Sequence, residues 1–234
     1  MIFPAYLIID LMTFGGPLFI SIIGKVKYLK NYKSFIPAIV IVAIHYIIWD
    51  MLVTGLDWHF NPLYVLSIRI VDLPLEEVMF FFVVPFAMLF VYEYIRYYVK
   101  EKTISERMAY YVFIPIFAIS TVITIFSYDI QYLFLAMISV DILFLAEIIT
   151  KFEMFRTRNY WIYMLMGLIA FLIVNYFLTS LPVVEYYHSK ILSTSYWNGR
   201  ITTIPLEDFI YNFALLSFYL FFYNIFNKKF ISKN

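Results

Sequence analysis

Seven long apolar stretches run along this 234-residue chain, and they constrain its fold more than any other feature. A helix needs about 20 consecutive apolar residues to cross the hydrocarbon layer of a membrane. Runs such as residues 78–90 are apolar on every face, which favours helices over the alternating pattern of a β-barrel. The sequence therefore predicts an all-α integral membrane protein with about seven transmembrane helices. We place the spans at residues 3–24, 35–55, 75–95, 108–126, 130–150, 160–181 and 206–227.

Composition supports a membrane environment for these stretches. Hydrophobic residues make up 64% of the chain and charged residues 14%, whereas a typical soluble domain is about half apolar and a quarter charged. The net charge of +1 gives no indication of a nucleic-acid partner. The absence of cysteine excludes disulfides, thiolate metal sites and cysteine nucleophiles. No spacing of His, Asp and Glu predicts a metal site.

Basic residues are unevenly divided between the predicted loops. With the N-terminus placed outside, only Arg69, Lys190 and Arg200 of the 17 Lys and Arg residues fall in outside segments. The other 14 fall in inside segments, as the positive-inside rule predicts. We therefore expect a multi-pass protein of the cell membrane with its N-terminus outside and its C-terminus in the cytoplasm.

A nine-residue stretch recurs where two of the spans begin. Residues 69–77 read RIVDLPLEE and residues 200–208 read RITTIPLED, an offset of 131 positions. The same offset relates Asp10 to Asp141. We predict two parallel three-helix repeats, residues 1–100 and 130–234, joined by a connecting helix within residues 101–129. A single connecting helix gives both repeats the same orientation in the membrane.

Each recurring stretch ends in an acidic pair, Glu76-Glu77 in the first and Glu207-Asp208 in the second. Proline followed by acidic residues is also a good helix start, because acids in a first turn are stabilised by the helix dipole. However, the pairs occur at matching places in both repeats, and apolar helix follows each of them at once. Both observations favour a functional site at the outer edge of the hydrocarbon over a simple helix start.

Adjacent carboxyl groups in such a place have a specific chemical property. Burial in a medium of low dielectric disfavours the charged form of a carboxyl group, and a like charge beside it disfavours that form further. One carboxyl group can then keep its proton at neutral pH while a neighbour is ionised. The sequence thus predicts a general acid and a general base held close together in a partly dehydrated pocket.

Other polar and aromatic residues are candidates for the lining of that pocket. Asp50 lies near the outer end of the second span, whereas Asp10 and Asp141 lie deeper and have either a proton-handling role or a role in helix–helix hydrogen bonding. Tryptophan is common at membrane interfaces, and it also stabilises cations through its ring face. The predicted substrate-binding residues are Asp50, Asp10 and Asp141 with Trp49, Trp58 and Trp197.

The chain resembles the lycopene cyclase domain family at Trp49-Asp50, Trp58, Asn61-Pro62 and the two acidic motifs. This membrane family, distinct from the flavoprotein cyclases, occurs as two small subunits in some bacteria, and the two repeats here resemble those subunits fused. The second copy departs from the first, since it carries Asp208 as its second acid and Asn175-Tyr176 where Trp49-Asp50 would be expected. The resemblance implies that Glu76, Glu77, Glu207 and Asp208 are catalytic.

The resemblance also implies a reaction, the cyclisation of the ψ end groups of lycopene or a related linear carotenoid to β-rings. A proton is added to the terminal double bond, the next double bond attacks the resulting cation, and loss of a proton completes the ring. The reaction is redox-neutral, so one acid and one base suffice and no cofactor is expected. The chain has no G-x-G-x-x-G stretch for a flavin. The expected partners are the lipid membrane and a carotenoid from the bilayer; a homo-oligomer is left open.

Two other classes of seven-helix protein are alternatives to a cyclase. A retinal protein needs a lysine within its last span for the Schiff base, and residues 205–227 contain none. A membrane transporter or proton-conducting protein would use parallel repeats and intramembrane carboxylates. Against it, only Gly15-Gly16-Pro17 looks like a broken helix. This second alternative stays open at the level of the sequence.

Overall fold

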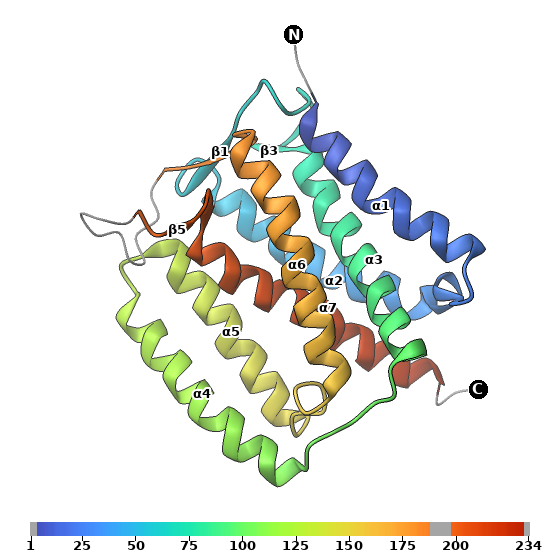
Figure 1. Cartoon of the computed structure of the whole chain (residues 1–234). Coiled ribbons are helices and arrows are strands. Elements are labelled where there is room, and N and C mark those ends of the chain that lie inside the picture. Colours follow the sequence, from blue (N-terminus) through green and yellow to red (C-terminus); the bar gives the residue numbers. More distant parts are fainter. Residues whose placement is uncertain (1–3, 188–197, 232–234) are drawn as a thin grey trace.

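The structure is a computed structural model that describes residues 4–187 and 198–231. Within these residues, seven helices are long and apolar enough to cross a membrane (Figure 1). This confirms the predicted all-α membrane fold. The helices are α1 (Ala5–Ile23), α2 (Tyr32–Val53), α3 (Leu75–Tyr98), α4 (Glu106–Phe126), α5 (Gln131–Ile149), α6 (Arg158–Ser180) and α7 (Leu206–Ile231), with a short 3₁₀ helix η1 (Tyr28–Asn31) before α2.

The two acidic motifs begin α3 and α7 at the same end of the bundle, which we call the motif end (Figure 1). Pro74 precedes α3 with a φ of −62° and extended ψ, the usual geometry of a helix N-cap. Glu76 and Glu77 lie in the first turn of α3, and Glu207 and Asp208 lie in the first turn of α7. The residue types therefore start both helices as the sequence predicts.

A short hairpin precedes each of these helices and has the same geometry in both halves. Its turn contains a β-branched residue at positive φ, Val71 at 57° and Thr202 at 58°. Such a conformation costs on the order of 1–3 kcal/mol, so its recurrence at an offset of 131 residues indicates that both halves require it. The hairpins are β2 (Arg69–Ile70) with β3 (Leu73–Pro74), and β5 (Arg200–Ile201) with β6 (Ile204–Pro205).

The helices pack as two related halves around α3 and α7. Within the halves, α1 packs on α3 and α5 packs on α7; between the halves, α2 packs on α7 and α3 packs on α6 (Figure 1). Helix α4 packs on α5 at one edge of the bundle. The Tyr219 hydroxyl on α7 donates to the Phe81 carbonyl on α3 at 2.8 Å, a buried link between the halves. The motif helices thus form the centre of the molecule.

A two-stranded ribbon joins the loops of the two halves at the motif end. Strand β1 (Trp58–Phe60) pairs antiparallel with β4 (Val184–Tyr186), and Trp58 lies opposite Tyr186. The Asn61 side-chain amide donates to Glu185 Oε1 at 2.8 Å and ties the ribbon together. The ribbon therefore covers the end of the bundle where the acidic pairs lie.

Candidate active site

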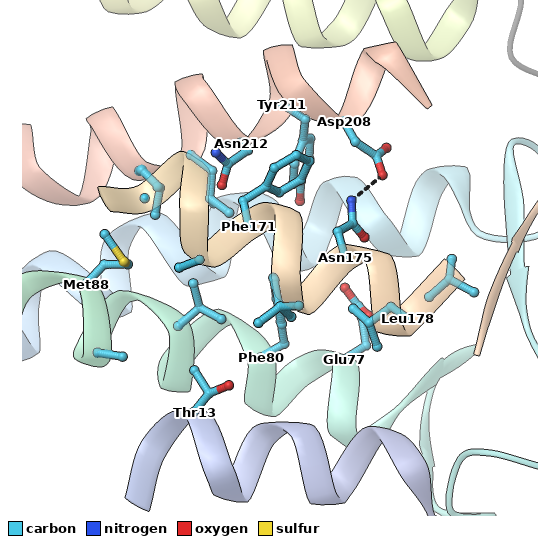
Figure 2. A pocket seen from close by; sticks show the side chains of 18 of the residues that line it. Thr13, Glu77, Phe80, Met88, Phe171, Asn175, Leu178, Asp208, Tyr211 and Asn212 are labelled. Carbon is cyan, nitrogen blue, oxygen red and sulfur yellow. Dashed lines mark hydrogen bonds between the residues drawn. The ribbon is translucent and has the colours of Figure 1, made fainter. Parts of the chain in front are cut away.

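A cavity of about 220 Å³ lies between the two halves, many times the roughly 10–15 Å³ that one water molecule needs. Its carboxyl groups, from Asp50 on α2, Glu77 on α3 and Asp208 on α7, are grouped toward the motif end. Side chains such as Phe80, Met88 and Phe171 line the rest of it (Figure 2). The cavity is thus an apolar groove with a polar, acidic end.

Glu77 belongs to a cluster at the acidic end in which two carboxyl groups touch. Its side chain is 8% exposed, and Glu77 Oε2 accepts a hydrogen bond of 2.5 Å from the Tyr6 hydroxyl on α1. The carboxyl groups of Glu77 and Asp50 also lie within hydrogen-bonding reach of each other. Tyr211 on α7 lies beside Asp50, and both line the cavity. Two buried carboxyl groups this close repel each other when both are ionised, and they can share a hydrogen bond only if at least one of them carries a proton.

Asp208 has a different environment, made of donors. Asp208 Oδ1 accepts from the Tyr132 hydroxyl at 2.7 Å. Its Oδ2 accepts from the Asn175 amide at 2.7 Å, shown as a dashed line in Figure 2, and from the Tyr186 hydroxyl at 2.8 Å. Hydrogen bonds donated to a carboxylate stabilise its ionised form. The three donors therefore favour the ionised form of Asp208, which lies at the opposite wall of the same cavity.

Tyr186 contributes to this site from the covering ribbon. Burial raises the pKa of the Tyr186 phenol well above its usual value, and the negative charge of Asp208 raises it further. The phenol is therefore neutral and remains a donor to Asp208. The Arg200 guanidinium holds it in place, because it donates to the Tyr186 carbonyl at 3.3 Å and lies 5.6 Å from the Tyr186 ring centroid.

The two clusters are related copies that differ at one chemical position. Tyr6 contacts Glu77 just as Tyr132 contacts Asp208. Asp50 contacts Glu77 just as Asn175 contacts Asp208. Asp50 therefore corresponds to Asn175. The alignment of Trp49-Asp50 with Asn175-Tyr176 in the sequence had instead paired Asp50 with Tyr176.

The contacts also correct the predicted equivalence of Asp10 and Asp141. Tyr6 on α1 corresponds to Tyr132 on α5, a smaller offset than the one between the motifs. Asp10 is 1% exposed, lies within electrostatic reach of Glu76 and Glu77, and has no partner for either carboxyl oxygen. Asp141 instead accepts from the hydroxyls of Ser120 and Thr124 on α4, at 2.6 and 2.7 Å. Neither carboxyl group lines the cavity.

The first acid of each motif is buried but does not line the cavity. Glu76 is fully buried and Glu207 is 2% exposed, and both are absent from the cavity wall. Glu76 Oε1 accepts from the Leu66 backbone N–H at 2.7 Å and so anchors the loop before the hairpin. The structure thus brings Glu77 and Asp208 together and places Glu76 and Glu207 behind them.

The three predicted tryptophans have different positions. Trp58 lines the cavity and packs 5.0 Å from the Tyr132 ring. Trp49 is buried outside the cavity wall, where it stacks on Tyr46 with ring centroids 5.6 Å apart. Trp197 lies outside the residues that the structure describes. Among the described residues, no group of three or more His, Asp and Glu side chains is placed to hold a metal ion.

The sequence analysis missed four tyrosines at the site: Tyr6, Tyr132, Tyr186 and Tyr211. With 22 tyrosines in the chain, composition gives no means to single them out. The signal that was present is positional: Tyr6 and Tyr132 occupy comparable places in the first helices of the two halves. Three of these phenols donate hydrogen bonds to the site, that of Tyr6 to Glu77 and those of Tyr132 and Tyr186 to Asp208.

Comparison with known proteins agrees with this two-copy arrangement. The family model described as lycopene cyclase matches the chain twice, at residues 4–95 and 129–226. The starts of the two regions are 125 residues apart and the ends 131, and the offset of 126 between Tyr6 and Tyr132 is close to the first of these values. Searches of the curated proteins and of the solved structures returned no match. Since the matched regions cover most of the chain, it belongs to the lycopene cyclase family, whose members are carotenoid-cyclising enzymes.

Proposed function

We propose that this protein is a lycopene β-cyclase that converts the ψ end groups of lycopene, or of a related linear carotenoid, to β-rings without redox change. The observation that carries the proposal is the meeting of three carboxyl groups, Asp50, Glu77 and Asp208, in one cavity. General acid and base groups are all that the reaction requires. Glu77 and Asp208 are the groups that reach the substrate, and Glu76 and Glu207 position them.

The shape and lining of the cavity suit a long apolar substrate. Both Glu77 and Val91 on α3 line it, and fourteen helical residues correspond to about 21 Å. A hydrocarbon chain can lie along this groove with one end at the carboxyl groups. The groove passes Thr13 and Pro17 on α1 and Gly167 and Ala170 on α6, helices with largely exposed apolar faces. The substrate therefore enters sideways from the bilayer.

The surroundings of the carboxyl groups protect a carbocation. Trp58, Tyr132 and Tyr211 present aromatic rings to the cavity, and ring faces stabilise cations. The β1–β4 ribbon lies over the acidic end, so bulk water is kept from capturing the intermediate. We place this motif end outside and the C-terminus in the cytoplasm, on the distribution of the basic residues. A proton-conducting role is less well supported, because most of the groove is apolar.

The proposal predicts a pigment change. Cells that accumulate lycopene and express this chain are expected to produce β-carotene or its one-ringed relative, identified by chromatography and absorption spectra. The Asp72→Asn variant is the matched control, since Asp72 is an exposed carboxylate in the first hairpin. It is expected to behave as the parent chain. Unchanged lycopene in cells with confirmed membrane insertion would refute the proposal.

A second prediction concerns Tyr132, one of three donors to Asp208. A hydrogen bond to a charged group contributes about 1.5–3 kcal/mol, and the Asn175 and Tyr186 donors remain. Tyr132→Phe is therefore expected to lower the rate of ring formation about tenfold while the protein still inserts. Tyr128→Phe, at an exposed position just before α5, is the control. Equal rates for the two variants would contradict the role of Tyr132.

A further inference from the structure

The pseudo-symmetry of the site is broken at the residue beside each cavity carboxyl group. Glu77 has a carboxyl group, Asp50, as its neighbour, whereas Asp208 has an amide, Asn175, at the corresponding place. A carboxyl neighbour requires a shared proton, and an amide neighbour donates its own N–H. This difference favours a protonated pair in the first copy and an ionised carboxylate in the second.

We infer that the Asp50–Glu77 pair is the general acid of the ring closure and that Asp208 is its general base. This inference rests on the proposed cyclase function and assigns the two roles within it. It also makes Asp50, on α2, a catalytic residue alongside the two motif acids.

Two observations on the acid side support the assignment. The carboxyl groups of Asp50 and Glu77 are both buried and lie within hydrogen-bonding reach of each other, where two negative charges would repel, so the pair holds at least one proton. Asp50 is 2% exposed, and its Oδ1 has no hydrogen-bond partner. A buried oxygen without partners is much less costly on a neutral carboxylic acid than on a carboxylate. The pair therefore stores a transferable proton at the cavity wall.

Asp208, the proposed general base, has a hydrogen-bonding environment that favours the ionised form. Asp208 is 3% exposed and accepts three hydrogen bonds, from Tyr132, Asn175 and Tyr186. All three groups are donors toward it, and none can supply a carboxylic proton. An ionised Asp208 facing the cavity stabilises a nearby cation electrostatically and can accept its proton. Asp208 does not need to carry a proton itself, because all three of its hydrogen bonds are donated by other groups.

The reaction balances with these two groups. The pair gives a proton to the terminal double bond, which leaves a tertiary cation. The electrons of the next double bond then form the ring bond, and the positive charge moves to the ring carbon that carries a methyl group. Asp208 takes the proton from the ring-junction carbon, and the electrons of that C–H bond form the β-ring double bond. The pair has lost one proton and Asp208 has gained one, and its return to the pair restores the enzyme.

Infrared spectroscopy tests the protonation states without any substrate. In purified protein at neutral pH, a protonated carboxyl group gives a C=O stretching band that a carboxylate lacks. Asp50→Asn and Glu77→Gln are each expected to remove the same component of this band, whereas Asp208→Asn leaves it unchanged. Asn175→Asp is expected to add a component, because it recreates a carboxyl pair at Asp208. Loss of the band in Asp208→Asn alone would overturn the inference.

Product analysis tests the roles in cells that accumulate lycopene. Without its base, the ring cation loses protons from other positions, so Asp208→Asn is expected to lower total rings and shift the remainder from β toward other double-bond isomers. Asp50→Asn is expected to lower all rings in equal proportion, because no cation forms. The exposed Asp129→Asn variant is the control and changes neither quantity.

The two tests separate the inference from the function on which it rests. An isomer shift in Asp50→Asn with none in Asp208→Asn would overturn the role assignment and leave the cyclase function standing. A parent chain that makes no ring while its infrared bands respond as expected would refute the cyclase function alone. The Asn175→Asp band keeps the inference testable even where a variant at Asp50 or Asp208 fails to fold.

Discussion

Glu77→Gln is expected to lower ring formation by about 10²–10⁴-fold, the usual contribution of a positioned proton donor or acceptor. Glutamine keeps the shape of the side chain and can accept from the Tyr6 hydroxyl. However, its amide donates to Asp50, so the two side chains no longer need a shared proton. The measurement is the amount of cyclic carotenoid per folded protein, with folding checked by size-exclusion chromatography.

Glu76→Gln gives the comparison that makes this result specific. Glu76 is the adjacent residue and is even more buried, but it points to the Leu66 N–H and not into the cavity. Glutamine can accept that hydrogen bond, so we expect a loss of no more than about tenfold. Equal losses in Glu76→Gln and Glu77→Gln would contradict the division of roles within the motif.

The membrane fold could be predicted because its main determinant, the length of each apolar segment, can be read directly from the sequence. Apolar length decides which segments span a bilayer, and the apolar run after Glu77 or Asp208 leaves no other solution. The hairpins could not be predicted in the same way. Val71 and Thr202 adopt positive φ although β-branched residues disfavour it, so the tertiary structure imposes this turn against local preference.

The acids of the site could be predicted in part. The motif pointed to Glu77 and Asp208, but sequence spacing gave no means to tell them from Glu76 and Glu207, because adjacent helical residues point in different directions. Which residue faces the cavity depends on the rotation of α3 and α7, and packing on α2 and α6 sets that rotation. The partner phenols come from other helices and loops, so no local pattern marks them.

The predicted equivalence of Asp10 and Asp141 was wrong because no single offset relates the two repeats along their whole length. The motifs are related by an offset of 131, and applying it to the first helices paired Asp10 with Asp141. The two matched regions instead start 125 residues apart, so extra residues in the second half shift the alignment. Tyr6 and Tyr132 are equivalent because they contact equivalent acids, so the three-dimensional contacts establish the relation for individual residues.

Ala170→Trp is expected to block the groove and lower ring formation about tenfold or more. Ala170 is half-buried on α6 and lines the cavity on the inner side of the carboxyl groups. A small residue there leaves space for a hydrocarbon chain, and a tryptophan would fill that space. Overpacking of a fitted site costs about 1–3 kcal/mol, and here the cost falls on the bound carotenoid. The measurement is again cyclic product per folded protein.

Ile173→Trp is the matched control, because Ile173 lies almost one turn further along α6 and is 56% exposed on the outer face of the bundle. A tryptophan there contacts lipid and leaves the groove open, so ring formation is expected to stay near the parent value. If Ala170→Trp kept full activity as well, the carotenoid would have to reach Glu77 and Asp208 by another path. If instead only Ala170→Trp lost activity, while lycopene and the protein were present in normal amounts, the chain of the substrate must lie along α6. That position agrees with an end group seated between the carboxyl groups and a polyene extending toward the cytoplasmic half of the bundle.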